Sequence, residues 1–106
     1  MAAIEVAPLD ELPPGSMRLV PTGAAQRVGV FNCGGRLFAI EDRCSHDDGP
    51  LCQGYWEPEG CVVVCPRHGA RFDLETGSPL TLPAFLPVST FPVEVRDGVV
   101  YVEVPD

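Results

Sequence analysis

The chain has 106 residues, 45% of them hydrophobic, and this size suits one compact domain without a second domain that carries its own active site. Seven Lys and Arg residues against fifteen Asp and Glu residues give a formal net charge of −8, which argues against nucleic acid and anionic lipid as partners. A basic patch on a protein partner matches this charge better, although acidity also serves simply to keep a chain in solution.

Eight short runs have the residue types of β-strands, in chain order 4–6, 17–20, 26–31, 37–41, 61–64, 70–73, 91–95 and 99–104. One turn of helix is expected at 9–12, with Asp10 as its N-cap. Twelve Pro and eleven Gly residues favour short strands joined by many turns. The pattern predicts an all-β, antiparallel domain.

Two hairpins are predicted from their turn residues. Gly34-Gly35 separates two of the strands, and Asp97-Gly98 is a stronger signal between the last two. In the second hairpin, apolar residues alternate with polar ones, so one face is expected to be buried. The residues of that face are Val93, Val95, Val100, Val102 and Val104.

The first twelve residues hold three acidic residues and no Lys or Arg, unlike a secretory signal, and no apolar run approaches the roughly 20 residues that span a bilayer. We therefore expect a cytoplasmic protein that does not bind membranes. In a reducing compartment, five cysteines are more naturally metal ligands and spare thiols than a disulfide framework.

Each of the two histidines lies beside a cysteine, in Cys44-Ser45-His46 and, after 18 intervening residues, in Cys65-Pro66-Arg67-His68. With five Cys and two His placed at random, such a double pairing would occur on the order of once in a few hundred sequences. The alternation of apolar and polar residues also disappears between residues 41 and 60, so something other than a hydrophobic face must order this segment. A metal centre is the natural candidate.

Two thiolates and two imidazoles can hold either one Zn²⁺ or one [2Fe–2S] cluster. Zinc fingers usually pair like ligands in separate knuckles, whereas here each motif supplies one Cys and one His. In a cluster, the two Cys can bind one iron and the two His the other, an arrangement that suits two such loops side by side. The cluster is favoured, and a structural zinc module stays as the non-redox alternative.

With these motifs the sequence resembles the Rieske family, whose pattern is Cys-x-His followed, some fifteen to twenty residues later, by Cys-x-x-His. Similar residues also fall at Gly49-Pro50-Leu51, Pro66, Gly69, Phe72-Asp73 and Gly77. The resemblance implies one [2Fe–2S] cluster per chain, with Cys44 and Cys65 on the buried iron and His46 and His68 on the outer iron. It also implies a Rieske-type antiparallel β-sandwich as a single domain, with a cluster-binding subdomain at about 42–75 inserted in a base of 1–41 and 76–106.

Within the family the sequence resembles the ferredoxins of bacterial aromatic-ring dioxygenase systems. This implies a monomeric single-electron carrier between a flavin-dependent NAD(P)H reductase and a separate terminal non-haem iron oxygenase. No substrate pocket or acid/base pair is evident, so no catalytic residue is assigned and no turnover is expected from the chain alone. The alternatives are a redox accessory protein of iron–sulfur assembly and a nitrite reductase small-subunit-like protein, although members of the latter group commonly lack these ligands.

Departures from the respiratory branch of the family carry information about the reduction potential. That branch adds a disulfide between two positions that are Gly49 and Arg67 here, so the bridge cannot form. It also places Ser and Tyr hydroxyls near the cluster sulfurs, where this chain has Ala70 and Phe72. Because hydrogen bonds to sulfur stabilise the reduced cluster, we expect a potential at the low end of the Rieske range, about −150 mV.

Three cysteines are left without a histidine. Cys33 and Cys61 lie in or beside strands and are expected to be ordinary core or edge thiols, whereas Cys52 is the one suspected of oxidative sensitivity. Tyr55-Trp56 is expected to anchor the loop by packing.

Overall fold

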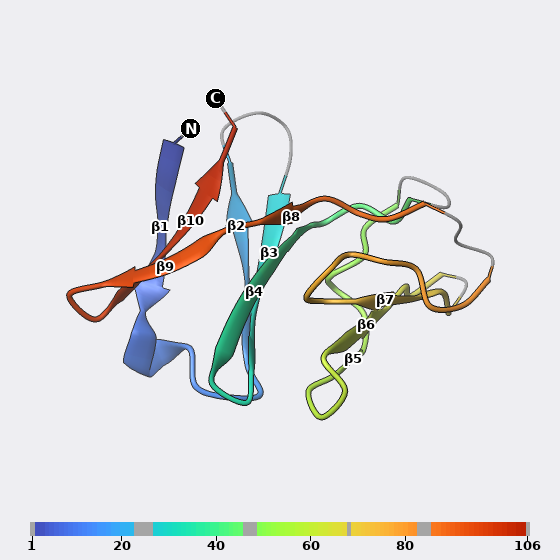
Figure 1. The fold of residues 1–106 in the computed structure, drawn as a ribbon, viewed down its shortest axis with the longest axis horizontal. Helices are drawn as coiled ribbons and strands as arrows, with labels where there is room; N and C mark the ends of the chain where they lie inside the picture. The colour runs from blue at the N-terminus through green and yellow to red at the C-terminus, as the bar shows by residue number, and fades with distance from the viewer. Residues whose placement is uncertain (1, 23–26, 46–48, 68, 83–85, 106) are drawn as a thin grey trace.

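The computed structural model describes residues 2–22, 27–45, 49–67, 69–82 and 86–105, and within them the chain forms three antiparallel sheets (Figure 1). The all-β, antiparallel prediction is confirmed. The first sheet has the order β1 (Ala2–Pro8), β10 (Val99–Val104), β9 (Val93–Arg96). The second has the order β2 (Met17–Pro21), β3 (Arg27–Cys33), β4 (Arg36–Glu41), β8 (Thr90–Phe91). The third has the order β5 (Trp56–Glu57), β6 (Val62–Val64), β7 (Arg71–Asp73).

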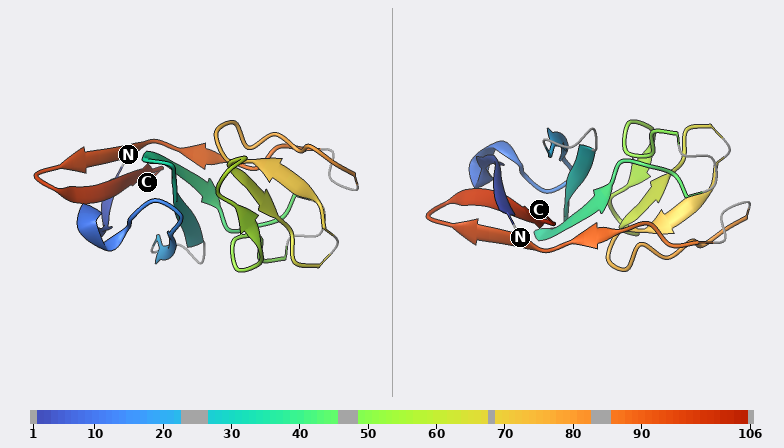
Figure 2. Two further views of the ribbon diagram at one scale, coloured as in Figure 1. Left: turned by 90° about the horizontal axis from the view of Figure 1, so that it is seen from below. Right: turned by 90° about the horizontal axis from the view of Figure 1, so that it is seen from above.

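The second sheet has a hydrophobic core on each of its faces. Val28 and Val30 of β3 pack with Val100 and Val102 of the first sheet, whereas Phe31 packs in a separate core with Phe72 of the third sheet. Because neighbouring residues of a strand point to opposite faces, β3 is buried from Val28 onward and shows no polar alternation. The three sheets therefore follow one another along the molecule (Figure 2).

The chain crosses from the second sheet to the first at Pro92. Phe91 pairs with Ala39 of β4, and Val93 pairs with Val102 of β10. The sequence predicted one strand at 91–95, and the structure corrects this to two, β8 and β9. Proline has no N–H to donate to a ladder, so a break between two sheets falls naturally at this residue.

Both predicted hairpin turns are confirmed. Gly34 and Gly35 have φ values of +65° and +100°, and Asp97 and Gly98 have φ values of +51° and +76°, the left-handed conformations that two-residue hairpin turns require. The predicted buried face of the last hairpin is wrong at Val95, which is 42% exposed. This residue lies on the edge strand β9, near a hairpin end that projects away from the second sheet (Figure 1).

The predicted helical turn is a 3-10 helix at Leu9–Glu11. Its N-cap is Pro8, without a side-chain hydrogen bond, so the prediction of Asp10 as N-cap is wrong. In the described ranges, no helix has the length and apolar character needed to cross a membrane. The strand β5 was not predicted, and the division into a base and an inserted subdomain at about 42–75 stays a prediction.

Candidate metal centre

Two of the four predicted ligands, Cys44 and Cys65, lie in the described part of the chain, and His46 and His68 lie outside it. Cys44 follows β4, and Cys65 directly follows β6. Neither cysteine is disulfide-bonded, and their exposures are 0% and 1%. Both belong to the core between the second and third sheets. The structure thus brings thiols from two separate loops into one interior region.

The first ligand loop runs from Asp42 to Cys52 and is closed by hydrogen bonds across its base. The Cys44 N–H donates to the Gly49 carbonyl at 2.8 Å. Asp42 Oδ1 accepts the backbone N–H groups of Leu51, at 2.9 Å, and Cys52, at 2.7 Å. One carboxylate therefore joins the beginning of the loop to its end.

The second ligand loop connects the antiparallel strands β6 and β7. The Cys65 N–H donates to the Ala70 carbonyl at 2.8 Å, and the Gly69 N–H donates to the Cys65 carbonyl at 3.0 Å. Gly69 has a φ of +72°, a conformation that side chains disfavour. Each predicted ligand cysteine thus begins a tight loop whose backbone is tied back to the cysteine itself.

The side chains around the two thiols are apolar. Leu51, Ala70 and Phe72 are fully buried in the same core as Cys44 and Cys65. Ala70 and Phe72 occupy the positions where the respiratory branch carries hydroxyls, and neither has one to donate. The weak hydrogen bonding to sulfur, and the low reduction potential inferred from it, stay predictions.

Cys52 is the third cysteine outside any disulfide, and it packs against β3. A Cβ on Gly29 would lie 2.6 Å from Cys52 Sγ, so only glycine permits this approach. Burial, followed by the nearby Asp42 charge, raises the pKa of the Cys52 thiol far above its ordinary value. Because the thiolate is the form that reacts and binds metal, this burial and the raised pKa argue against the oxidative sensitivity predicted for Cys52.

Cys33 and Cys61 form a disulfide, with a Cα–Cα distance of 5.8 Å. The expectation that both are ordinary thiols is therefore wrong. The bond joins the end of β3 to the residue before β6, so it links the second sheet to the third. The pairing depends on how two sheets meet, which the spacing of 28 residues along the chain does not reveal.

The predicted packing anchor is confirmed for Trp56 alone. Its ring meets Phe31 edge to face, with centroids 5.0 Å apart, whereas Tyr55 is 65% exposed. On the same sheet, the Arg71 guanidinium donates two hydrogen bonds to Glu57, at 2.8 and 2.5 Å. These bonds lower the pKa of Glu57 below its ordinary value and tie β7 to β5 across β6.

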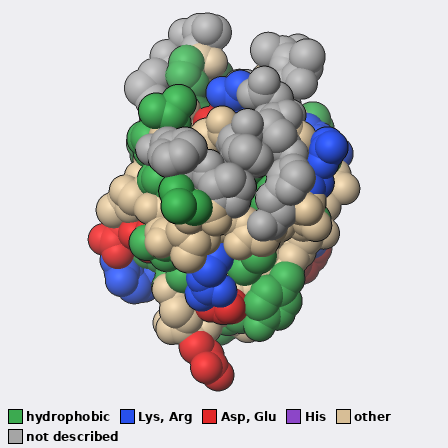
Figure 3. All heavy atoms as spheres, turned by 90° about the vertical axis from the view of Figure 1, so that its right-hand side faces the viewer, with side chains coloured by type: hydrophobic (Ala, Val, Ile, Leu, Met, Phe, Trp, Pro, Cys, Tyr) green, Lys and Arg blue, Asp and Glu red, His purple; other side chains and the backbone are tan. Residues whose placement is uncertain are grey.

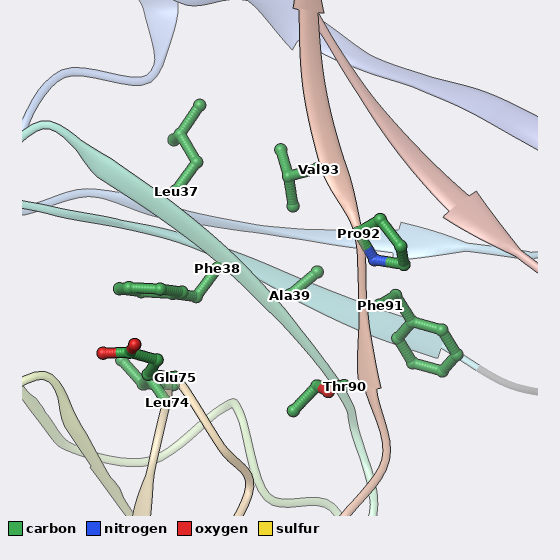
Figure 4. Close-up of a pocket in the computed structure, with 9 residues that line it drawn as sticks. All are labelled: Leu37, Phe38, Ala39, Leu74, Glu75, Thr90, Phe91, Pro92 and Val93. Atoms are coloured by element: carbon green, nitrogen blue, oxygen red, sulfur yellow. The ribbon is translucent and has the colours of Figure 1, made fainter.

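A hollow of about 420 Å³ lies between β4, the turn after β7 and the β8–β9 segment (Figure 4). Its lining is largely apolar, and Glu75 is its one ionisable side chain. Glu75 pairs with Arg36 at 3.1 Å.

The donors that the structure describes fit an iron–sulfur centre. Two buried thiols from two separate loops, in one apolar core, are what the sulfur side of such a cluster requires. Among residues 2–22, 27–45, 49–67, 69–82 and 86–105, no three His, Cys, Asp or Glu side chains gather as a metal site.

Comparison with known proteins decides the family. Residues 2–92 match the model of the Rieske [2Fe-2S] domain. The chain belongs to the Rieske [2Fe–2S] family. Within it the chain is a ferredoxin of the dioxygenase systems, an electron carrier that is not itself catalytic, and its cofactor is the Rieske [2Fe–2S] cluster.

Three similar proteins carry this conclusion. The ferredoxin is 39% identical to the 3-phenylpropionate/cinnamic acid dioxygenase ferredoxin subunit of Shigella flexneri serotype 5b, over 100% of this chain and 97% of the relative. It is 34% identical to the ferredoxin of carbazole 1,9a-dioxygenase from Nocardioides aromaticivorans IC177, with a TM-score of 0.87 over 96% and 97% of the two chains. A chain in a complex of reduced oxygenase and oxidized ferredoxin in carbazole 1,9a-dioxygenase matches with the same TM-score and identity, over 94% of this chain and 91% of that one.

These matches confirm the predicted Rieske fold and the electron-carrier role. They favour a dioxygenase ferredoxin over an accessory of iron–sulfur assembly, a nitrite reductase small subunit or a zinc module.

Proposed function

We propose that Cys44, His46, Cys65 and His68 ligate the cluster, with the two cysteines on the buried iron and the two histidines on the outer iron. The observation that carries the proposal is the burial of the Cys44 and Cys65 thiols in one core, at the starts of two separate closed loops. When bound, such a cluster takes up and gives back one electron. Each histidine follows its cysteine by two or three residues in the sequence, so each motif supplies one thiol and one imidazole.

We propose further that the electron comes from a flavin-dependent NAD(P)H reductase and goes to a terminal non-haem iron oxygenase. The support for the acceptor is the similarity to a chain found in an oxygenase–ferredoxin complex. Dependence on NAD(P)H, a cytosolic reductant, supports a cytoplasmic location, although a disulfide such as Cys33–Cys61 is rare in that compartment. A monomer with one exposed contact region is the simplest carrier between two partners.

The contact region is proposed to include three exposed leucines beside the ligand loops. Leu80, Leu82 and Leu86 are 51%, 71% and 66% exposed. The Ser45 hydroxyl, in the first ligand loop, donates to the Leu86 carbonyl at 2.6 Å, and the Leu80 N–H donates to the Arg71 carbonyl beyond the second loop at 2.7 Å. Figure 3 views this end of the molecule and shows hydrophobic, basic and acidic side chains among its described residues.

The pathway is tested by reconstitution with a flavin reductase, NADH and a candidate oxygenase. Substrate oxidation should rise with ferredoxin concentration and stop when the ferredoxin is left out. Leu82→Glu should raise the ferredoxin concentration needed for half-maximal turnover about tenfold, with an unchanged visible spectrum. Val95→Glu, an exposed valine on the far hairpin, is the matched control and should have no effect. Equal turnover without the ferredoxin would refute the pathway.

The ligand assignment is tested by single substitutions. Cys44→Ser, Cys65→Ser, His46→Ala and His68→Ala should each abolish the cluster spectrum rather than merely slow electron transfer. Cys52→Ala is the matched control, because Cys52 is equally buried and belongs to the same core, and it should keep the spectrum. A full spectrum in any of the four ligand variants would remove that residue from the set.

A further inference from the structure

Asp42 is a buried carboxylate whose contacts organise the first ligand loop. Its side chain is 0% exposed, and it lies two residues before Cys44. Its Oδ1 atom accepts the N–H groups of Leu51 and Cys52 at the far end of the loop, at 2.9 and 2.7 Å. A side chain with this role fixes how the loop presents Cys44, so its position matters beyond simple packing.

The charge of Asp42 is offset by Arg27, from the start of β3. Arg27 Nη2 lies 3.1 Å from Asp42 Oδ2, and the Asp42 N–H donates to the Arg27 carbonyl at 2.8 Å. Oδ2 has no hydrogen bond in the described part of the chain, so the ion pair is its main compensation there. With the Gln53 amide oriented so that its oxygen faces Arg27, that oxygen accepts from both terminal nitrogens of the guanidinium, at 3.1 and 2.8 Å. The guanidinium therefore spans the two ends of the loop.

A buried negative charge close to a redox centre repels the added electron and so lowers the reduction potential. A positive charge that pairs with the negative one offsets this effect. The Arg27 side chain is 47% exposed, so solvent partly screens its charge, whereas the Asp42 side chain is fully buried. The two charges thus offset each other beside Cys44, and loss of either one alone leaves a net charge there.

We propose that Arg27 and Asp42 act as a positioning pair: Asp42 closes the loop that carries Cys44 and His46, and Arg27 neutralises the charge that this closure buries, so that the pair helps to set the reduction potential. The proposal rests on the ligand role of Cys44. It concerns positioning and charge, and neither residue is assigned to the cluster itself.

The experiment measures the reduction potentials of cluster-loaded variants by redox titration of the visible spectrum. Arg27→Gln leaves the carboxylate without its partner and should lower the potential. Asp42→Asn removes the charge, keeps an acceptor oxygen for the loop, and should raise it. The double variant should return toward the wild-type reduction potential, and Arg27→Lys, which keeps the positive charge, should stay near that value.

Arg96→Gln, on the hairpin at the opposite end of the molecule, is the matched charge control and should leave the reduction potential unchanged (Figure 1).

Hydrogen exchange of the loaded protein supplies a second readout. Asp42→Ala should speed exchange of the Leu51 and Cys52 amides, while Arg96→Gln should leave it unchanged. If Asp42→Asn does not retain the cluster, the reduction potentials of Arg27→Gln and Arg27→Lys still test whether the Arg27 charge matters. The proposal would be overturned if Arg27→Gln and Asp42→Asn shifted the reduction potential in the same direction. It would also be overturned if neither variant shifted the potential by more than Arg96→Gln does. Failure of the ligand assignment would be separate, since it would appear as a full Rieske spectrum in Cys44→Ser.

Discussion

At the scale of single residues, the surroundings of the five cysteines separate their roles better than the sequence does. Cys44 and Cys65 each begin a closed loop, Cys52 fills the space left by Gly29, and Cys33 and Cys61 are bonded to each other. The Cys-x-His and Cys-x-x-His motifs singled out Cys44 and Cys65 from the sequence, because each motif is a short local pattern. The packing of Cys52 required knowledge of which strand lies beside the loop.

The apolar side chains next to the thiols give a prediction about the reduction potential. Phe72→Tyr and Ala70→Ser each place a hydroxyl at a fully buried position of the ligand core. One new hydrogen bond to a charged sulfur, at about 1.5 kcal/mol in favour of the reduced form, would raise a one-electron potential by about 60 mV. Titration of the visible spectrum measures this shift. An unchanged or lower potential in both variants would contradict the account, and Phe91→Tyr, on the other core, is the control.

At the scale of elements, the sequence predicted what local chemistry decides. Asp97-Gly98 and Gly34-Gly35 are turn signals whose φ values the structure confirms, and the last strand has its predicted bounds. The break at Pro92, the short strand β5 and the exposure of Val95 depend on which sheet each segment joins. That information comes from contacts between distant parts of the chain.

The disulfide is the element-scale feature with a direct test. It closes a loop of 28 residues, and the loss of this constraint should cost about 3.5 kcal/mol of unfolding free energy in Cys33→Ser or Cys61→Ser. Urea denaturation of protein purified without reductant measures the difference.

Thiol titration in denaturant supplies the control for the disulfide. Wild-type protein should show three reactive thiols without reductant and all five after reduction. Wild-type protein treated with reductant should then unfold like the variants. Five reactive thiols before reduction would show that the bond does not form.

At the scale of the whole molecule, the second sheet separates two cores with different dependence on the metal. The core shared with the first sheet is built from aliphatic side chains, among them Val28, Val100 and Val102. The core shared with the third sheet contains Cys44 and Cys65, so its order depends on what these thiols bind.

Removal of the metal should therefore loosen one end of the molecule more than the other. Iron chelation is expected to lower the melting temperature and to speed hydrogen exchange across residues 49–75 more than across β1 and β10. Mass spectrometry of exchanged peptides gives the comparison, with the loaded protein as reference. Equal acceleration at both ends would show that the two cores are not energetically distinct.

The central claim is that two sulfurs and two imidazoles of this chain hold a pair of unequally ligated irons. The most direct measurement is metal and sulfide analysis of the purified protein together with its visible spectrum. The account predicts a red-brown protein with about two irons and about two labile sulfides per chain. A colourless protein that contains a single zinc would contradict it.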